Sequence, residues 1–306
     1  MKILFATDGS PSAKRAQALL ASLRLPDPST VEVLYVDQLF EEDTDLPERQ
    51  RLALDKLLRE DTDKQLAEVS AALSGPGREI ATTVVFGRPA SVISATAERI
   101  GADLVVLGSR GHGPFASALL GSVAAEVVDH APCPVLVARG MSVSRIVLAA
   151  DDSPGSRRAE KVLASLPFLG ALPVMVVSVA RLLPMSYPAG GPAFSGEMYQ
   201  EIIDEQRTFH KTVAAAAAKR LAEQGIATTA EAPEGDAAYG VIEAANAASA
   251  DLIVVGSRGN TGATRLLLGS VARGILYHAP CSVLVVRQTA AADLAAARPS
   301  AVRQVV

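Results

Sequence analysis

Glycine and serine recur at identical spacing in two loops of this chain, a pattern suited to holding phosphate groups. One loop reads GSRGHGPFASALLGS and the other GSRGNTGATRLLLGS. Glycine lets a ligand approach the backbone closely, and a helix that begins at a Gly-Ser pair offers N–H groups and a partial positive charge. The matched positions are Gly108, Gly111, Gly121 and Ser122 in the first loop and Gly256, Gly259, Gly269 and Ser270 in the second.

A mobile connection with ordinary helix capping would explain one such loop, but two copies with the same spacing favour phosphate binding. Ser122 and Ser270 can either cap a helix or bind a phosphate oxygen. The chain has no Walker A sequence, and the loops offer Arg110 and Arg258 as cations in place of a lysine. A GxGxxG motif after the first strand is also missing, which argues against NAD.

Two further matched pairs are candidates for contact with a nucleoside. Asp8 and Asp151 each follow the first strand expected in their half of the chain. Either can accept hydrogen bonds from a ribose or base or help to hold a metal, and either can instead cap the helix that follows. Val36 and Val179 end the second expected strand, where backbone groups could meet an adenine edge while the side chains join the core.

Other reactive residues predict no catalytic site and no dedicated metal site. The chain lacks HExxH, CxxC and GxSxG motifs. Cys133 and Cys281 occupy matched positions and are interpreted as small buried apolar residues. His130 and His278 are also matched, each at an expected helix end where a polar or cationic side chain is favourable.

The elements that must position these residues occur in two copies along the chain. A shift of 143 residues aligns the front of each half, and a shift of 148 aligns the back. The net insertion of five residues in the second copy lies between Val179 and Gly235. We therefore expect two homologous domains at 1–139 and 144–287, followed by a C-terminal tail at 288–306.

Within each copy, short β-branched runs alternate with amphipathic stretches. In the first copy, strands are expected at 2–7, 31–36, 81–86, 103–108 and 134–139, and helices at 11–24, 46–73, 89–101 and 121–131. This alternation predicts an α/β fold in which each domain has a five-stranded parallel sheet, buried on both faces by flanking helices. Ligands of such folds bind beyond the carboxyl ends of the strands, where the candidate residues fall.

Composition excludes several other classes of protein. The chain has 306 residues, 49% of them hydrophobic and 20% charged, with a net charge of −4 and no Trp. This is a globular composition without a general attraction for nucleic acid or for an acidic membrane surface. No apolar run approaches the length of a membrane span, and the first residues read as a strand rather than a signal peptide, so we expect a cytoplasmic protein.

Together, the loop, the strand-ending aspartates and the HAPCPVLVAR segment resemble the universal stress protein family in its tandem two-domain form. The resemblance covers residues 1–139 and 144–287 and implies two Rossmann-like domains of the adenine nucleotide alpha hydrolase-like fold. In that family this glycine loop marks the branch that binds ATP. The family also pairs its domains through the fifth strand, which implies a pseudo-dimer within this chain and allows a homodimer.

Carried over to this chain, the resemblance implies two ATP sites, with Mg²⁺ or Mn²⁺ at the phosphates. Nucleoside contacts would come from Asp8 and Val36 and from Asp151 and Val179, and the loop glycines and serines named above would hold ribose and phosphates. The second copy departs from the pattern at Asp152, which replaces Gly9, and in its longer Pro- and Gly-rich insertion. Both departures make occupancy of the second site the weaker expectation.

Three functions remain open at this point. The leading one is an ATP-binding regulator of stress response or survival with little or no turnover. The second is a slow ATPase or another nucleotide-using enzyme on the same fold, since fold alone does not decide function. The third is a scaffold whose loops are vestigial.

Overall fold

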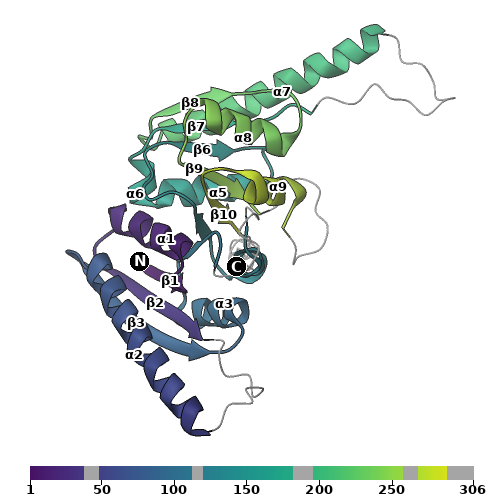
Figure 1. Cartoon of the computed structure of the whole chain (residues 1–306). Coiled ribbons are helices and arrows are strands. Elements are labelled where there is room, and N and C mark those ends of the chain that lie inside the picture. Colours follow the sequence, from purple (N-terminus) through teal and green to yellow (C-terminus); the bar gives the residue numbers. More distant parts are fainter. Residues whose placement is uncertain (38–47, 112–119, 182–195, 258–267, 288–306) are drawn as a thin grey trace, which may run out of the picture.

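Ten strands form one continuous sheet in the computed structural model of the chain, which describes residues 1–37, 48–111, 120–181, 196–257 and 268–287 (Figure 1). The strand order is β3-β2-β1-β4-β5-β10-β9-β6-β7-β8. The strands are β1 (Lys2–Thr7), β2 (Ser29–Asp37), β3 (Arg78–Phe86), β4 (Leu104–Gly108), β5 (Val135–Ala138), β6 (Ile146–Ala149), β7 (Val174–Val177), β8 (Thr228–Glu231), β9 (Leu252–Gly256) and β10 (Ser282–Val286).

Each half of the chain contributes five parallel strands, as the alternation of elements predicts. The halves meet where β5 pairs with β10 in the antiparallel sense, with Leu136 opposite Leu284 at the centre of the register. The expectation that the fifth strands pair within the chain is therefore confirmed.

Helices cover both faces of this sheet because successive residues of each strand point to opposite sides. Ile3 and Phe5 of β1 join one buried cluster, and Leu4 and Ala6 join the other. The first cluster includes residues of α1 (Pro11–Ser22), α2 (Glu48–Leu73), α5 (Pro154–Ser165), α6 (Pro167–Gly170) and α7 (Gly196–Ala222). The second includes residues of α3 (Pro89–Ile100), α4 (Ser122–His130), α8 (Ala237–Ala247) and α9 (Ser270–His278).

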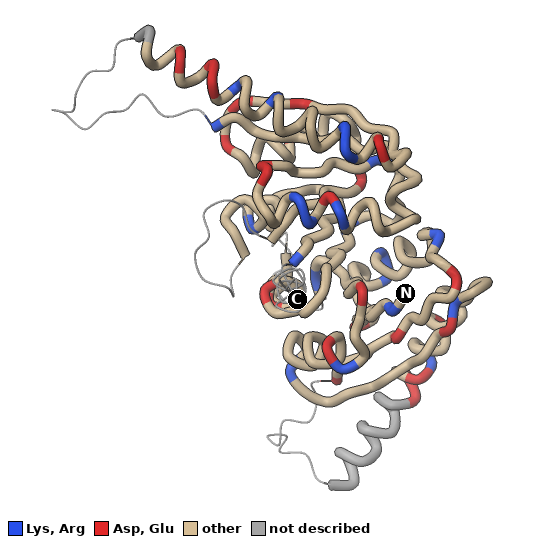
Figure 2. The backbone as a smooth tube through the Cα atoms, turned by 180° about the vertical axis from the view of Figure 1, so that it is seen from behind, with Lys and Arg blue, Asp and Glu red and all other residues tan. Residues whose placement is uncertain are grey.

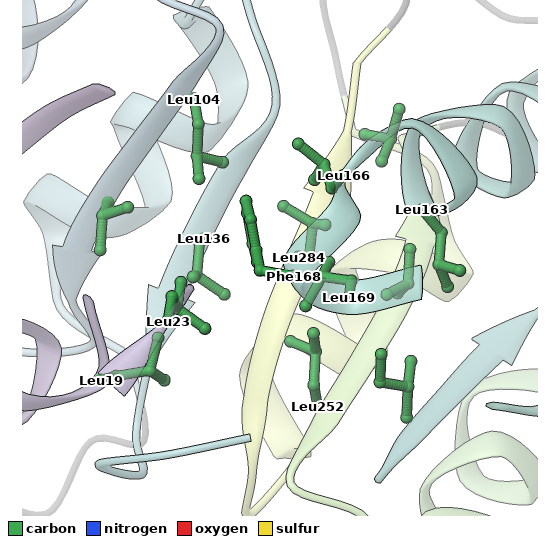
Figure 3. Packing of buried hydrophobic residues seen from close by; sticks show 14 of the residues in the cluster. Leu19, Leu23, Leu104, Leu136, Leu163, Leu166, Phe168, Leu169, Leu252 and Leu284 are labelled. Atoms are coloured by element: carbon green, nitrogen blue, oxygen red, sulfur yellow. The ribbon is translucent and has the colours of Figure 1, made fainter. Parts of the chain in front are cut away.

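The core continues across the junction between the halves. Phe168 belongs to α6, a four-residue helix that the sequence patterns do not predict. In Figure 3 its ring lies between Leu136 of β5 and Leu284 of β10, and all three residues belong to one buried cluster. The two halves thus share hydrophobic packing in addition to the strand pairing.

The outermost strands differ from the expectation that every strand is buried on both faces. β3 and β8 end the sheet, and the side chains of Val84 and Phe86 on β3 are 40% and 49% exposed. An edge strand has a neighbour on one side only, so helices cover it less completely.

Charged residues are distributed over both halves of the molecule. Figure 2 shows Lys and Arg interspersed with Asp and Glu along the described backbone rather than gathered on one element. In the described part of the chain, no helix is both long enough and apolar enough to cross a membrane.

Candidate functional site

The sequence-predicted residues gather at two points on the carboxyl edge of the sheet. β1 lies between β2 and β4, so Asp8, which follows β1, is next to the end of β4 at Gly108. In the second half, β6 lies between β7 and β9, and Asp151 takes the corresponding place beside Gly256. Both points are topological switch points, where parallel α/β sheets open a crevice for ligands.

Asp8 turns the chain between β1 and α1 without capping the helix. Its Oδ1 accepts a hydrogen bond from the Ser10 N–H at 3.0 Å, and Ser10 is the N-cap, with its Oγ accepting from the Ala13 N–H at 3.2 Å. The N-cap role considered for Asp8 therefore belongs to Ser10. The other carboxylate oxygen faces the glycine loop, because a methyl group on Gly111 would lie 2.6 Å from Asp8 Oδ2.

Asp151 forms the same turn in the second half. The Ser153 N–H donates to Asp151 Oδ1 at 3.0 Å, and Ser153 caps α5 by accepting from the Ser156 N–H at 3.1 Å. Two aspartates thus hold one geometry at two sites. In each, a carboxylate at the strand end is built into the turn but leaves helix capping to a serine.

Asp152 and Gly9 share the left-handed backbone conformation that this turn requires. Their φ values are 61° and 74°, a region that glycine enters without the steric cost paid by other residues. The Asp152 carboxylate forms an ion pair with Arg157 at 2.7 Å. Its added negative charge is therefore neutralised locally on α5.

Gly108 and Gly256 are required by helix packing. A methyl group on Gly108 would lie 2.7–2.9 Å from backbone atoms of Ser12 and Ala13 in α1. A methyl group on Gly256 would lie 2.5–2.9 Å from backbone atoms of Gly155 and Ser156 in α5. On the side where a side chain would project, each glycine is therefore approached closely by a helix, and not by a ligand as expected.

The second glycine of each loop starts the helix expected to face the phosphates. Gly121 is the N-cap of α4 and Gly269 the N-cap of α9, and neither helix has a side-chain cap. Each glycine N–H donates to a serine carbonyl just after the preceding strand, at 2.7 Å to Ser109 and 2.8 Å to Ser257. Ser122 and Ser270 follow as the first helical residues, so capping falls to the glycines.

The start of the first loop is tied to α1 by serine hydroxyls. The Ser10 Oγ donates to the Arg110 carbonyl at 3.3 Å, and the Arg110 N–H donates to Ser12 Oγ at 3.2 Å. The second half has Gly155 in the position of Ser12 and therefore lacks that hydroxyl. Gly259 and Arg258 of the second loop, and His112 of the first, lie outside the described residues.

Val36 is the last residue but one of β2, and Val179 lies two residues beyond the end of β7 rather than at its end as predicted; both side chains pack against the core. Val36 is partly buried, and Val179 is 7% exposed and packs against α8, where a methyl group on Gly240 would lie 2.9 Å from its side chain. Their preceding residues form contacts that the sequence patterns did not indicate. The Tyr35 side chain interacts with that of Thr62 of α2, which acts to lower the pKa of Tyr35, and Ser178 Oγ lies 2.8 Å from Nδ1 of His210 on α7.

The electrostatics of these contacts connect them to the aspartates. Burial raises the pKa of Tyr35, and the charges of Asp37 and Asp8 raise it further. Burial lowers the pKa of His210, while the charge of Asp151 acts in the opposite direction. The tyrosine and histidine rings therefore both lie within the field of the aspartate of their half.

The cysteines and the helix-end histidines lie apart from these two points. Burial raises the pKa of Cys133 to about 12 and that of Cys281 to about 11, so both thiols are protonated at neutral pH. His130 Nδ1 lies 2.8 Å from the Glu126 carbonyl at the end of α4, and His278 stacks on Tyr239. Within the described residues, no cluster of three His, Cys, Asp or Glu side chains is placed to hold a metal.

Comparison with known proteins places this geometry among proteins of one family. The model for the Universal stress protein family matches residues 1–139 and again 142–287. A universal stress protein of Thermus aquaticus is 39% identical over 137 residues, which cover 45% of this chain and 97% of that protein. One of Mycobacterium tuberculosis is 27% identical over 263 residues, which cover 76% of this chain and 79% of that protein. The crystal structure of a universal stress protein from Archaeoglobus fulgidus shares the fold, with a TM-score of 0.67, 19% identity, and coverage of 95% of this chain and 97% of that one.

Proposed function

The chain belongs to the universal stress protein family, and we propose that it is an ATP-binding member in which each half holds one nucleotide. The observation that supports this most directly occurs twice in the chain: an aspartate follows a strand, and a nearby helix begins at a glycine with no side-chain cap. The helices beside the aspartates are capped by serines, whereas α4 and α9 have no side-chain cap. The first N–H groups of a helix have no intrahelical partner, so α4 and α9 can receive an anion.

The strand order separates the two ends of the proposed ligand. In the first half, α4 follows β4 on one side of Asp8, and Val36 lies near the end of β2 on the other side. Phosphates would lie at Gly121 and Ser122, and the nucleoside would lie between Asp8 and the end of β2. In the second half, Gly269 and Ser270 would hold the phosphates, and Asp151 and the segment around Val179 would border the nucleoside.

A divalent ion would depend mainly on the nucleotide. Mg²⁺ prefers oxygen ligands and usually binds through one or two carboxylates together with substrate phosphates. Each described site supplies one aspartate, Asp8 or Asp151, which fits a Mg²⁺ or Mn²⁺ ion bound with ATP. The ion would neutralise phosphate charge.

Storage or sensing of ATP suits this site better than rapid hydrolysis. Neither glycine loop contains a lysine, the side chain that reaches the β and γ phosphates in P-loop enzymes. The function we propose is a regulator of stress response or survival, with a conformation or partner that changes when nucleotide binds. The cytoplasm, where ATP is abundant, is the proposed location.

Isothermal titration calorimetry with MgATP tests the proposal through its stoichiometry. We expect two ATP per wild-type chain, one in Gly121→Val, one in Gly269→Val and none in the double variant. Valine would cover the first N–H groups of α4 or α9, whereas the extended backbone at these N-caps accommodates a β-branched residue. Circular dichroism and the melting temperature would show that each variant remains folded.

The other functions predict different results. Steady release of ADP or AMP that is lost in Asp8→Asn together with Asp151→Asn would show a nucleotide-using enzyme. Absence of binding to the wild-type chain, together with no nucleotide in the denatured purified protein by mass spectrometry, would show a scaffold with vestigial loops. Two ATP bound to the double glycine variant would contradict the assignment of the phosphate sites.

A further inference from the structure

Near each aspartate, a side chain from a strand meets one from a helix, and the two halves differ in which of these elements supplies the ring. Tyr35, near the end of β2, contacts Thr62 of α2, so the ring comes from the strand and a small hydroxyl from the helix. Ser178, just after β7, contacts His210 of α7, so the small hydroxyl comes from the strand and the ring from the helix. The shift of 143 residues aligns Tyr35 with Ser178, and the shift of 148 that holds after the insertion, taken to lie before α7, aligns Thr62 with His210.

This pair lies on the nucleoside side of each proposed site. β2 and β7 flank β1 and β6 on the side away from β4 and β9, the strands that lead into the phosphate loops. The residues that follow Tyr35 and Ser178 are Val36 and Val179, the proposed nucleoside contacts. The charge of Asp8 acts on the pKa of Tyr35 and that of Asp151 on the pKa of His210, which agrees with a place for both rings on the nucleoside side of each proposed site.

We propose that His210, held by Ser178, is a nucleoside-contacting residue of the second site, and that it makes ATP binding there dependent on pH while binding at the first site lacks this dependence. The inference rests on the proposed function, because it assigns a residue to the nucleotide site already described. Its distinguishing feature is chemical. An imidazole titrates near neutral pH, whereas the tyrosine and threonine that form the first pair do not.

His210 is fixed in place and only partly exposed. Its Nδ1 lies 2.8 Å from Ser178 Oγ, which is fully buried, and its ring meets Phe209 edge to face with 5.2 Å between centroids. With Nδ1 directed at the strand, Nε2 is the nitrogen left to contact a ligand. Ser178 is too deeply buried to act as a nucleophile, so the Ser–His–Asp combination predicts binding rather than acyl transfer.

The charges around the ring set the direction of the pH effect. Asp151 at the end of β6 favours the protonated ring, and burial disfavours it. On α7 itself, Arg207 is paired with Glu234 at 2.5 Å and with Asp204 at 2.9 Å, and Lys211 lies within the field of Glu234. Glu234 belongs to the segment that follows β8, and Ser178 on the strand side is neutral.

A bound nucleoside would lower the pKa of His210 further. It would exclude water from the ring, and its hydroxyls would donate to Asp151 and weaken the attraction between this carboxylate and an imidazolium. A ligand that lowers the pKa of a group binds the deprotonated form more tightly. Affinity at the second site should therefore fall, relative to the first, as pH decreases through the pKa of His210.

Titration of ATP into single-site variants tests this. Gly121→Val leaves the second site, and Gly269→Val leaves the first, so the ratio of their affinities cancels the protonation of ATP itself. Between pH 7.5 and pH 5.5 we expect this ratio to change about threefold to tenfold against the second site, because one pKa unit corresponds to a factor of ten. In His210→Gln, which keeps hydrogen-bonding groups without titrating, the ratio should stay constant.

Swapping the two residue pairs between the sites gives a matched test, in which the pH dependence should move from the second site to the first. Tyr35→Ser with Thr62→His should confer the pH dependence on the first site, and Ser178→Tyr with His210→Thr should remove it from the second. Tight binding at both sites with a ratio independent of pH would overturn the role of His210 and leave the proposed function intact. Absence of ATP binding in both single-site backgrounds and in the wild-type chain would overturn both.

Discussion

Gly108 and Gly256 show that a glycine in a ligand loop can be required by the protein itself. Each ends a strand against the first turn of a helix, at distances that leave no room for a side chain. Gly121 sits in the same loop under weaker constraint, since a methyl group there would lie 3.3 Å from the nearest atom, the Arg110 Cα. The two glycines of one loop therefore have different consequences when replaced.

We predict that Gly108→Ala lowers the free energy of unfolding by about 2–3 kcal/mol, because α1 must move away from β4 to relieve the overlap. Gly256→Ala should have the same effect through α5. Gly121→Ala is the matched control and should cost about 1 kcal/mol or less, the usual difference at an N-cap. Urea denaturation measures all three, and equal losses at Gly108 and Gly121 would show that packing against α1 is not the constraint.

At the scale of single residues, the sequence predicted which side chains meet but not every role. The repeat placed Asp8 and Gly111 at one sheet edge, and the structure brings the Asp8 carboxylate to that glycine. The choice between capping and ligand contact at Asp8 needed coordinates, because Ser10 is an equally good cap two residues later. The Ser178–His210 contact joins residues 32 positions apart, and the alignment of Tyr35 with Ser178 and Thr62 with His210 was the signal available for it.

At the scale of elements, periodicity located the strands and helices and left their neighbours undetermined. The expected helix at 46–73 is α2 at Glu48–Leu73, and the one at 11–24 is α1 at Pro11–Ser22. α6 was not predicted, because a single turn is too short to show a period of 3.6 residues. The exposure of β3 was also missed, since a run of β-branched residues does not reveal whether a strand lies at the edge of its sheet.

An ion pair joins two helices of the second half and has no counterpart in the first. Arg220 of α7 donates through two nitrogens to Glu160 of α5, at 2.7 and 2.8 Å, and the Glu160 side chain is 8% exposed. The aligned residues in the first half are Gln17 and Ala72. Helices α5 and α7 are therefore held by a charge that is costly to leave unpaired.

We predict that Arg220→Ala lowers the free energy of unfolding by about 3 kcal/mol, because it leaves the Glu160 carboxylate buried without its partner. Glu160→Met with Arg220→Met should recover most of this loss, since no charge is then buried. Lys219→Ala removes an exposed pair with Glu223 one position away and should cost about 0.5 kcal/mol or less. Thermal unfolding at neutral pH measures these differences, and equal losses for Arg220→Ala and Lys219→Ala would contradict the prediction.

At the scale of the whole molecule, each half has an arginine that donates hydrogen bonds to the other half across their junction. Arg139 follows β5 and donates to the carbonyls of Cys281 at 3.3 Å and of Leu276 in α9 at 2.5 Å. Arg287 follows β10 and donates to the carbonyl of Val128 in α4 at 2.7 Å. Each arginine therefore binds near the carboxyl end of the last helix of the other half. The amino end of that same helix faces the proposed phosphate site. Burial at the junction lowers the pKa of Arg139 to about 10.

This exchange predicts that the halves unfold together. Shared packing at Phe168, the antiparallel pairing of β5 with β10 and the two arginines make each half part of the other's core. We expect a single transition by calorimetry for the wild-type chain.

Arg139→Met and Arg287→Met should each lower the free energy of unfolding by about 2 kcal/mol, the scale of hydrogen bonds to a charged donor, and together they should separate the transition into two. Lys219→Met, which removes a pair with Glu223 in which both side chains are exposed, is the control and should leave one transition at nearly the same temperature. Two transitions already present in the wild-type chain would show that strand pairing joins two independently stable domains, and that the exchanged arginines do not couple them.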